Sequence, residues 1–190
     1  RDGDALLAGT RPGANGLTLL PFFNGERTPD LPQARAALFG MDANNLDAAN
    51  AYRAAMEGAT FALRYGFDAL HAAGLAFDSI RLTGGGSNSP VWRQMVADVF
   101  DLPVDVPEQS EGAAFGAALQ ALWSQRRAEG DSTTSLVATV QEHVRLDPQR
   151  SARPQAEASE AYRSHYRRYL EWLDCMRRMH APTPTSDARA

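Results

Sequence analysis

Three consecutive glycines between an apolar strand and a helix constrain this sequence most. Residues 79–83 (SIRLT) alternate as a β-strand does, and residues 84–90 then read Gly-Gly-Gly-Ser-Asn-Ser-Pro. An amphipathic helix follows from Val91, and Pro90 suits its first turn because a proline there sacrifices no helical hydrogen bond. The polar residues before Pro90 can cap that helix. This stretch therefore predicts a strand, a tight turn and a helix in immediate succession.

The neighbouring segments repeat this order. Residues 103–107 (PVDVP) predict a second short strand, and residues from about 111 to 127 predict a second helix. Residues 17–23 (LTLLPFF) predict a buried strand nearer the N-terminus. Strands that alternate with helices favour an α/β layer with parallel pairing. The side chains expected to point inward from the helix at 111–127 are Phe115, Ala118, Leu119, Leu122 and Trp123.

Two longer helices flank this layer. The first runs from about Leu46 to Ala73, with Asn44 or Asn45 as its cap and Gly74 at its end. Its apolar residues recur every three or four positions and so share one face. They are Leu46, Ala49, Tyr52, Met56, Ala59, Leu63, Phe67, Leu70 and Ala73. The last helix, from about 156 to 179, carries an apolar stripe of Tyr162, Tyr166, Tyr169, Trp172, Leu173 and Met176.

Residues 130–155 show no clear periodicity and predict a connecting segment. We expect residues 1–180 to form one domain and residues 181–190 (APTPTSDARA) to be a disordered tail.

The composition excludes several classes of function. All 19 basic residues among the 190 are arginine, so a Walker A phosphate loop and a lysine Schiff base are excluded for this chain. The formal charge of −4 disfavours a nucleic-acid surface, and no apolar run approaches the ~20 residues that span a bilayer. The lone Cys175 suits a reducing compartment. The four histidines form no HExxH pair, so we predict no metal site in these residues.

The glycine turn is the best candidate site. Backbone N–H groups at the start of a helix are unpaired and attract anions, and glycine lets a ligand approach the backbone closely. A tight turn that only packs a helix against a sheet is the alternative. Ser89 stands where a GxGxxG dinucleotide fingerprint needs its last glycine.

Three ordered motifs between about residues 17 and 123 resemble the FGGY family of carbohydrate kinases, and within it the xylulokinases. Residues 83–99 (TGGGSNSPVWRQMVADV) resemble the family's C-terminal signature. Residues 23–29 (FNGERTP), with Ala34-Arg35 and Phe39-Gly40 beyond, resemble a loop typical of xylulokinases. Residues 111–118 (EGAAFGAA) resemble the family's helix of small residues.

The resemblance implies an α/β fold of the actin-like ATPase, ribonuclease-H-like type, of which this chain would be the C-terminal domain, truncated at its N-terminal side. It implies ATP with Mg²⁺, the metal held mainly through the nucleotide and the missing domain. The family's contacts to phosphates and adenosine carry over to Gly84, Gly85 and Gly86. An adenine-pocket position corresponds to Ser89, where glycerol-kinase relatives have Asn, and the neighbouring Asn88 is the substitute candidate.

The family's phosphate loop, sugar-binding residues and catalytic Asp precede the GERTP segment, so no catalytic residue is assigned here. The expected function is the ATP-binding part of a cytoplasmic kinase that converts D-xylulose to D-xylulose 5-phosphate, with the pentulose bound by the missing N-terminal domain. The fragment should be inactive alone, and a homodimer is among the assemblies considered. The alternatives are a related kinase acting on ribulose, glycerol or another polyol, and a non-catalytic module that senses a nucleotide or metabolite.

Four further features have two interpretations each. Glu26 and Arg27 are interpreted as a buried ion pair holding their loop rather than as cleft-closing groups. Trp92 is interpreted as a core anchor rather than an adenine stacking partner. The small residues of 112–118 favour close helix packing over a nucleotide contact. The arginines of residues 163–178 favour a docking helix over an RNA or membrane surface, because acidic residues offset them.

Overall fold

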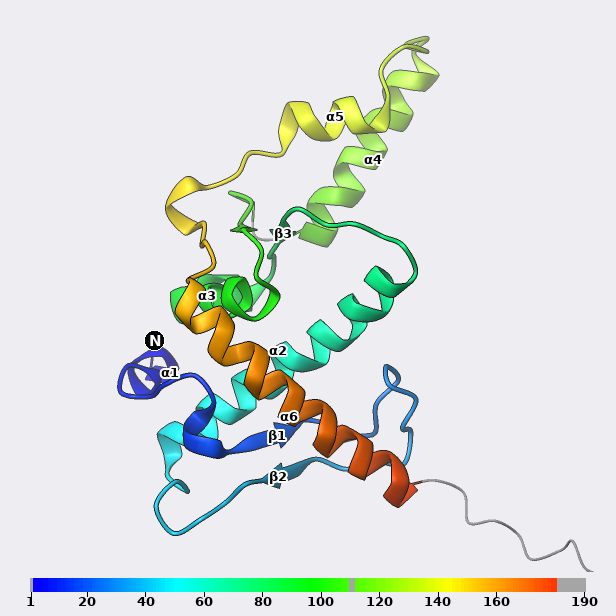
Figure 1. The fold of residues 1–190 in the computed structure, drawn as a ribbon. Helices are drawn as coiled ribbons and strands as arrows, with labels where there is room; N and C mark the ends of the chain where they lie inside the picture. Colours follow the sequence, from blue (N-terminus) through cyan, green and yellow to red (C-terminus); the bar gives the residue numbers. More distant parts are fainter. Residues whose placement is uncertain (1, 110–111, 181–190) are drawn as a thin grey trace, which may run out of the picture. The chain divides into compact units, whose positions relative to one another are not determined.

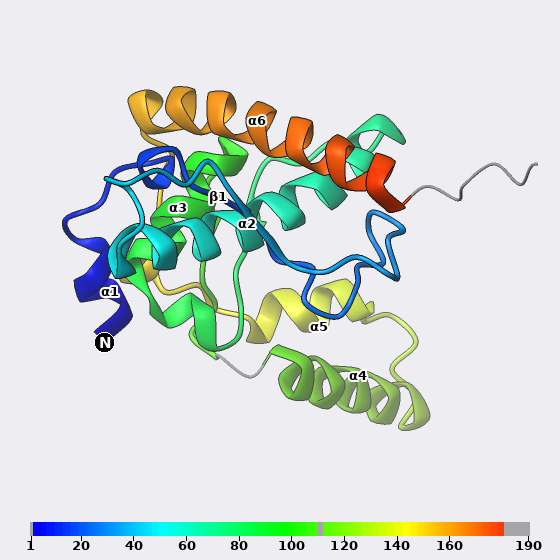
Figure 2. The same ribbon diagram turned by 90° about the horizontal axis from the view of Figure 1, so that it is seen from below.

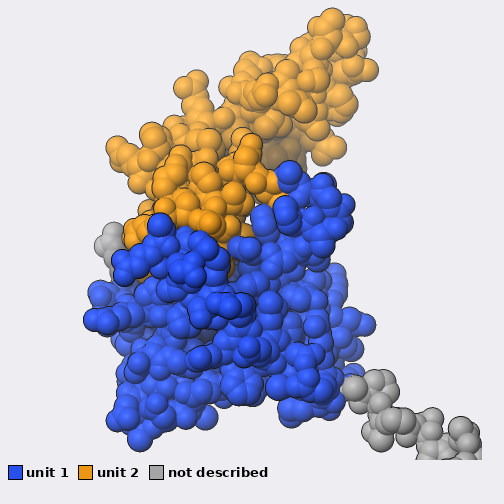
Figure 3. Space-filling model, viewed as in Figure 1, with its two compact units in different colours: residues 1–76, 156–190 blue, residues 77–155 orange. Residues whose placement is uncertain are grey.

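The computed structural model describes residues 2–109 and 112–180. Figure 3 shows the two compact units into which the chain divides, residues 1–76 with 156–190 and residues 77–155. The expected single domain of residues 1–180 stays a prediction, and the expected disordered tail lies outside the described residues.

The first unit is built on a two-stranded antiparallel sheet. Strand β1 (Thr18–Leu20) pairs with β2 (Ala37–Phe39), and Leu19 lies opposite Leu38. Helices α2 (Ala48–Ala72) and α6 (Ala156–His180) both pack against β1 and against each other (Figures 1 and 2). The short α1 (Asp2–Leu7) also contacts α2, and a 3-10 turn at Ala14–Gly16 leads into β1. The strand predicted over residues 17–23 is thus shorter than expected, and its antiparallel partner β2 was not predicted.

Helix α2 does not bury the apolar stripe that its sequence periodicity defines. Leu63 and Leu70 of that stripe are 54% and 49% exposed. The buried face instead consists of Arg53, Ala54, Glu57, Gly58, Thr60 and Phe61. Gly58 explains this choice, because a Cβ there would overlap the Leu19 carbonyl of β1. The helix approaches the strand through its smallest residue, and that contact decides which face points inward.

Helix α6 covers the core with the stripe that its sequence predicts. Tyr162, Tyr169, Leu173 and Met176 are buried, and the rings of three of its tyrosines surround Phe61 of α2 at centroid distances of 5.5–6.2 Å. Trp172 stacks on Phe39 of β2 with the centroids 4.4 Å apart. The docking role predicted for this helix is confirmed.

The ends of α2 are set by local hydrogen bonds. Asp47, and neither Asn44 nor Asn45, is the N-cap, because its carboxylate accepts from the Asn50 N–H at 2.8 Å. Asn45 is buried and donates to the Gly40 carbonyl instead. Gly74 follows the helix with φ +91°, as predicted.

The second unit contains the predicted parallel pair. Strand β3 (Ile80–Arg81) lies beside β4 (Val104–Asp105), with Ile80 opposite Val104. Helix α3 (Pro90–Phe100) packs against β4, and its residues 95–100 are buried. The other side of β4 pairs with residue 152 through two hydrogen bonds of 2.9 Å between Val104 and Ala152.

The segment 130–155 is more ordered than predicted. It contains the helix α5 (Leu136–His143), capped by Ser135 and packed against α4 (Gly112–Ala128), and a 3-10 turn at Pro148–Arg150. Periodicity failed here because α5 spans only eight residues. The predicted start of α4 at residue 111 lies outside the described residues.

The predicted packing of α4 is wrong for most of its small residues. Of its expected inward positions only Leu119 is buried, and Ala118 is exposed. Gly112 does lie close to Thr83, but a Cβ at Gly116 would meet nothing within 4 Å.

Of the helices in the described residues, none is long and apolar enough to cross a membrane.

Candidate functional site

The glycine turn connects β3 to α3 through a 3-10 turn, Gly85–Asn88. Gly84 has φ +81° and ψ −175°, a conformation open essentially to glycine alone. The Gly84 carbonyl accepts from the Ser87 N–H at 3.1 Å and from the Ser87 hydroxyl at 2.7 Å. Ser87 is 0% exposed, so its side chain closes the turn from inside.

The three glycines expose a row of backbone donors. Gly84, Gly85 and Gly86 are all exposed, and their N–H groups have no hydrogen-bond partner within residues 2–109 and 112–180. A Cβ at Gly84 or Gly85 would meet nothing within 4 Å, so there is open space beside the backbone. Adjacent unpaired N–H groups with free access suit an anion such as a phosphate.

Gly86 also has a packing role that the sequence did not reveal. A Cβ at this position would overlap the six-membered ring of Trp92. Trp92 lies half-buried in the first turn of α3 and covers the turn from that side. Trp92 is thus half-buried against the turn, and its interpretation as a core anchor rather than an adenine stacking partner stays a prediction.

Ser89 and Asn88 both make hydrogen bonds within the protein. Ser89 is the N-cap of α3, and its hydroxyl oxygen accepts from the Trp92 N–H at 3.0 Å. The unpaired amides therefore belong to the glycines and not to the capped N-terminus of α3. The Asn88 side-chain oxygen accepts from Arg150 at 2.8 Å. The predicted adenine contacts of both residues stay predictions.

Two arginines donate hydrogen bonds to Ser87 at the base of the turn. Arg93 in α3 donates from Nη1 to the Ser87 carbonyl at 2.7 Å. Arg150 donates from Nη2 to the same carbonyl and to the Ser87 hydroxyl, both at 3.1 Å. Their guanidinium groups place positive charge at Ser87 and Asn88, which follow the three glycines directly, and this charge favours an anionic ligand at the turn.

The sequence analysis did not identify Arg93 and Arg150 as contacts of the glycine turn, and the reasons differ. Helical side chains point back toward the N-terminus, so an arginine early in α3 could have been expected to reach the turn. Arg150 carries no such signal, because it lies 63 residues from Ser87 in the segment interpreted as a connection.

The GERTP loop differs from its interpretation as an ion pair. Within the described residues Glu26 and Arg27 form no ion pair, and Arg27 is exposed. The Glu26 carboxylate instead accepts from the backbone N–H groups of Arg27 and Thr28, at 2.7 and 3.2 Å. Two backbone hydrogen bonds of 2.9 Å join Glu26 to Leu31 and close the loop.

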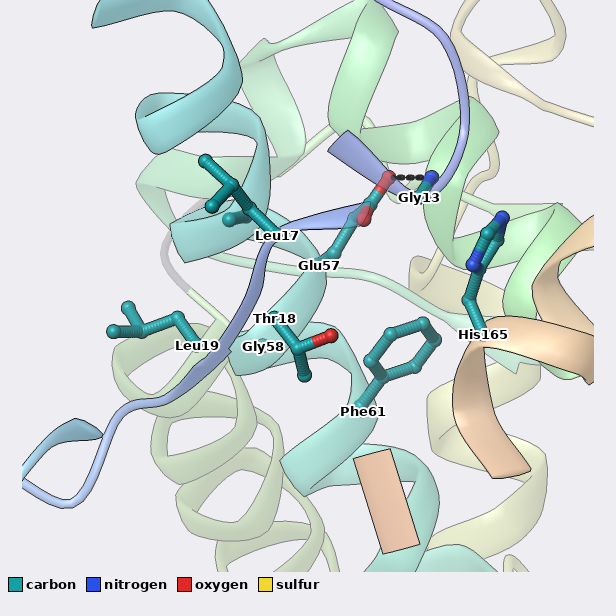
Figure 4. Close-up of a pocket in the computed structure, with 9 residues that line it drawn as sticks. Gly13, Leu17, Thr18, Leu19, Glu57, Gly58, Phe61 and His165 are labelled. Atoms are coloured by element: carbon teal, nitrogen blue, oxygen red, sulfur yellow. Dashed lines mark hydrogen bonds between the residues drawn. The ribbon is translucent and has the colours of Figure 1, made fainter. Parts of the chain in front are cut away.

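A buried charged network lies between α2, α6 and the N-terminal loop of the first unit. Figure 4 shows its Glu57 side chain, which is hydrogen-bonded to Gly13. Glu57 accepts from the Gly13 N–H at 2.9 Å and from Arg53 at 3.2 Å. Arg53 also donates to the Tyr162 hydroxyl at 2.9 Å and to the Thr10 hydroxyl at 2.6 Å. The cavity beside Glu57, which Gly13, Phe61 and His165 line, leaves no volume for a water molecule, so we assign the buried Glu57–Arg53 pair to structure and not to ligand binding.

Burial shifts the pKa values of Glu57 and His165, which both contact Gly13. It raises the pKa of Glu57 to about 7, although the Gly13 N–H and the Arg53 charge act in the opposite direction. It lowers the pKa of His165, whose ring packs on Gly13, and the nearby Arg168 charge adds to that effect.

No group of three or more potential metal ligands (His, Cys, Asp or Glu) occurs in the part of the chain that the structure describes. The unpaired amides and the charge of the two arginines are chemically suited to an anion such as a phosphate.

Comparison with known proteins identifies the family. Residues 4–125 match the model of the C-terminal domain of the FGGY family of carbohydrate kinases. The chain is 44% identical over 161 residues to a xylulose kinase of Haemophilus influenzae, covering 85% of this chain and 31% of that protein. A gluconokinase of Bacillus subtilis is 32% identical over 140 residues, which cover 72% of this chain and 27% of that protein.

The fold is that of the solved structures. A ligand-bound xylulose kinase of Lactobacillus acidophilus superposes with a TM-score of 0.83 at 23% identity, over 94% of this chain and 35% of that one. This likeness confirms the predicted actin-like ATPase fold class. The chain spans about a third of the length of the proteins it matches. The chain belongs to the FGGY family of carbohydrate kinases.

Proposed function

We propose that this chain is the nucleotide-binding C-terminal part of a longer kinase that transfers the γ-phosphoryl group of Mg-ATP to D-xylulose. The observation that carries the proposal is the exposed row of N–H groups at Gly84–Gly86, backed by Arg93 and Arg150. Phosphoryl transfer depends mainly on positioning the phosphates and neutralising their charge. The amides of this turn and the two arginines could contribute to both.

The residues of this chain would bind and orient the nucleotide. The glycine amides would donate to phosphate oxygens, and the arginine charges would lower the cost of bringing the anion to the turn. The nucleotide supplies the phosphoryl group, and the proton acceptor for the sugar hydroxyl would belong to the rest of the kinase. The 190-residue chain alone should therefore phosphorylate nothing, in the cytoplasm or in vitro.

Substitution of Gly85 tests the nucleotide site with little structural disturbance. Gly85 lacks a positive φ, and a Cβ there meets nothing, so Gly85→Leu should fold normally. The leucine would fill the approach to the amides, and we expect ATP affinity of the full-length kinase to fall at least about tenfold, or about 1.4 kcal/mol. Titration calorimetry with ATP and, separately, with sugar gives the measurement.

Gly9→Leu is the matched control, because Gly9 is another turn glycine without positive φ and with nothing within 4 Å of a Cβ. It should leave ATP affinity unchanged. Unchanged ATP affinity in Gly85→Leu would refute the proposed nucleotide site.

The choice of sugar is tested separately. The relationship to a xylulose kinase supports D-xylulose, whereas the gluconokinase match favours gluconate as the main competitor. We expect kcat/KM to be highest for D-xylulose when gluconate, ribulose and glycerol are compared. A higher kcat/KM for any of these three would overturn the substrate assignment and leave the nucleotide site standing.

A further inference from the structure

The side chain of Arg150 joins a distant segment to the glycine turn through several acceptors at once. Its Nη2 lies 3.1 Å from the Ser87 carbonyl, 3.1 Å from the Ser87 hydroxyl and 2.8 Å from the Asn88 side-chain oxygen. Two of these acceptors belong to a residue that is fully buried. The contact therefore fixes the buried Ser87 and also the exposed side chain of Asn88.

The segment that carries Arg150 is itself anchored. The Asp147 carboxylate caps its 3-10 turn by accepting from the Gln149 N–H at 2.9 Å. Two residues beyond Arg150, Ala152 exchanges a pair of backbone hydrogen bonds with Val104 of β4. The backbone that carries the Arg150 side chain is thus held in place by its pairing with β4.

We propose that Arg150 is a positioning residue of the nucleotide site, which holds the Gly84–Gly86 amides outward and presents the Asn88 amide nitrogen as a donor to the nucleotide. The proposal rests on the proposed function of the turn. Because the Asn88 oxygen accepts from Arg150, the nitrogen is the part of that amide left to a ligand. Fixing donors before the ligand arrives removes an ordering cost from binding.

Steady-state kinetics of the full-length kinase test this role. Arg150→Gln should raise KM for ATP about fivefold to twentyfold, with KM for the sugar within twofold of wild type. Arg150→Lys keeps the charge and a single donor nitrogen but not the planar guanidinium, so it should recover part of the ATP affinity. Arg145→Gln, an exposed arginine of the same segment, is the control and should change neither constant.

A double-mutant cycle separates positioning from general stability. If Arg150 acts through the turn, Arg150→Gln should have less than a twofold further effect in the Gly85→Leu background. A merely structural role predicts equal effects in both backgrounds, or a loss of thermal stability with an unchanged KM for ATP, and either result overturns the proposal. Failure of Gly85→Leu to weaken ATP binding would instead refute the nucleotide site itself.

Discussion

In the first unit the N–H of Gly13 is closed off by the buried Glu57 carboxylate, whereas in the second unit the N–H groups of Gly84–Gly86 have no partner in the described residues. Both turns present backbone N–H groups that can bind negative charge. One turn has its anion within the fold, and the other leaves that place open. The difference indicates which glycine turn builds structure and which can bind a ligand.

The largest expected effect comes from breaking the closed turn. Glu57→Ala leaves the Arg53 charge buried without its carboxylate, so we expect the free energy of unfolding to fall by about 3–5 kcal/mol. Hydrogen-exchange mass spectrometry should show faster exchange in α2 and α6.

The exposed Glu171 on α6 provides the control, and Glu171→Ala should change stability by less than about 0.5 kcal/mol. ATP affinity per folded molecule should be unaffected by Glu57→Ala. Equal losses of stability in the two variants would contradict the structural role of the closed turn.

The closed turn should also make stability depend on pH. Because burial raises the pKa of Glu57 from 4.5 to about 7, the folded state binds this proton more tightly than the unfolded chain does. The contribution of Glu57 to the free energy of unfolding therefore falls as pH rises from about 4.5 to about 7, by roughly 1–3 kcal/mol, and levels off above that range. Glu57→Gln should flatten this part of the profile, measured as urea midpoints between pH 5 and 8. An equally steep profile in the variant would assign the effect to other groups.

A third prediction divides the open turn into a binding part and a packing part. Gly86→Ala should destabilise the protein by about 1–3 kcal/mol, because the new methyl group overlaps the Trp92 ring. Gly85→Ala is the matched control and should cost almost nothing. Thermal unfolding of Gly86→Ala in a Trp92→Leu background should show a smaller cost, and an undiminished cost would contradict the steric explanation.

The smallest expected effect concerns Ser89. Ser89→Ala removes the cap of α3 and should cost about 1 kcal/mol of stability, whereas Ser89→Asp keeps an acceptor for the Trp92 N–H and should retain it. Unfolding by urea measures both variants. A fully stable Ser89→Ala protein would contradict the capping role.

Local sequence patterns predicted the helices and strands better than they predicted the contacts between them. The stripe of α6 and the glycine after α2 follow from residues close together in sequence, and the parallel pairing of β3 with β4 follows from the alternation of strands and helices. The helix α5 was missed because eight residues give too little periodicity. The sequence offered the glycine turn only as a candidate site. The structure shows unpaired amides at Gly84–Gly86, and nucleotide binding there stays a proposal.

The sequence by itself determined that a strand, a glycine turn and a capped helix follow one another, because steric and hydrogen-bonding preferences act over a few residues. Only the tertiary structure decided that α2 buries Gly58 and Glu57 in place of its leucines, since the approach of β1 sets that face. It likewise decided that Gly86 packs on Trp92 and that Arg150 reaches Ser87 across 63 residues. The Arg150 contact and the face of α2 depend on how distant segments pack, which no local pattern in the chain encodes.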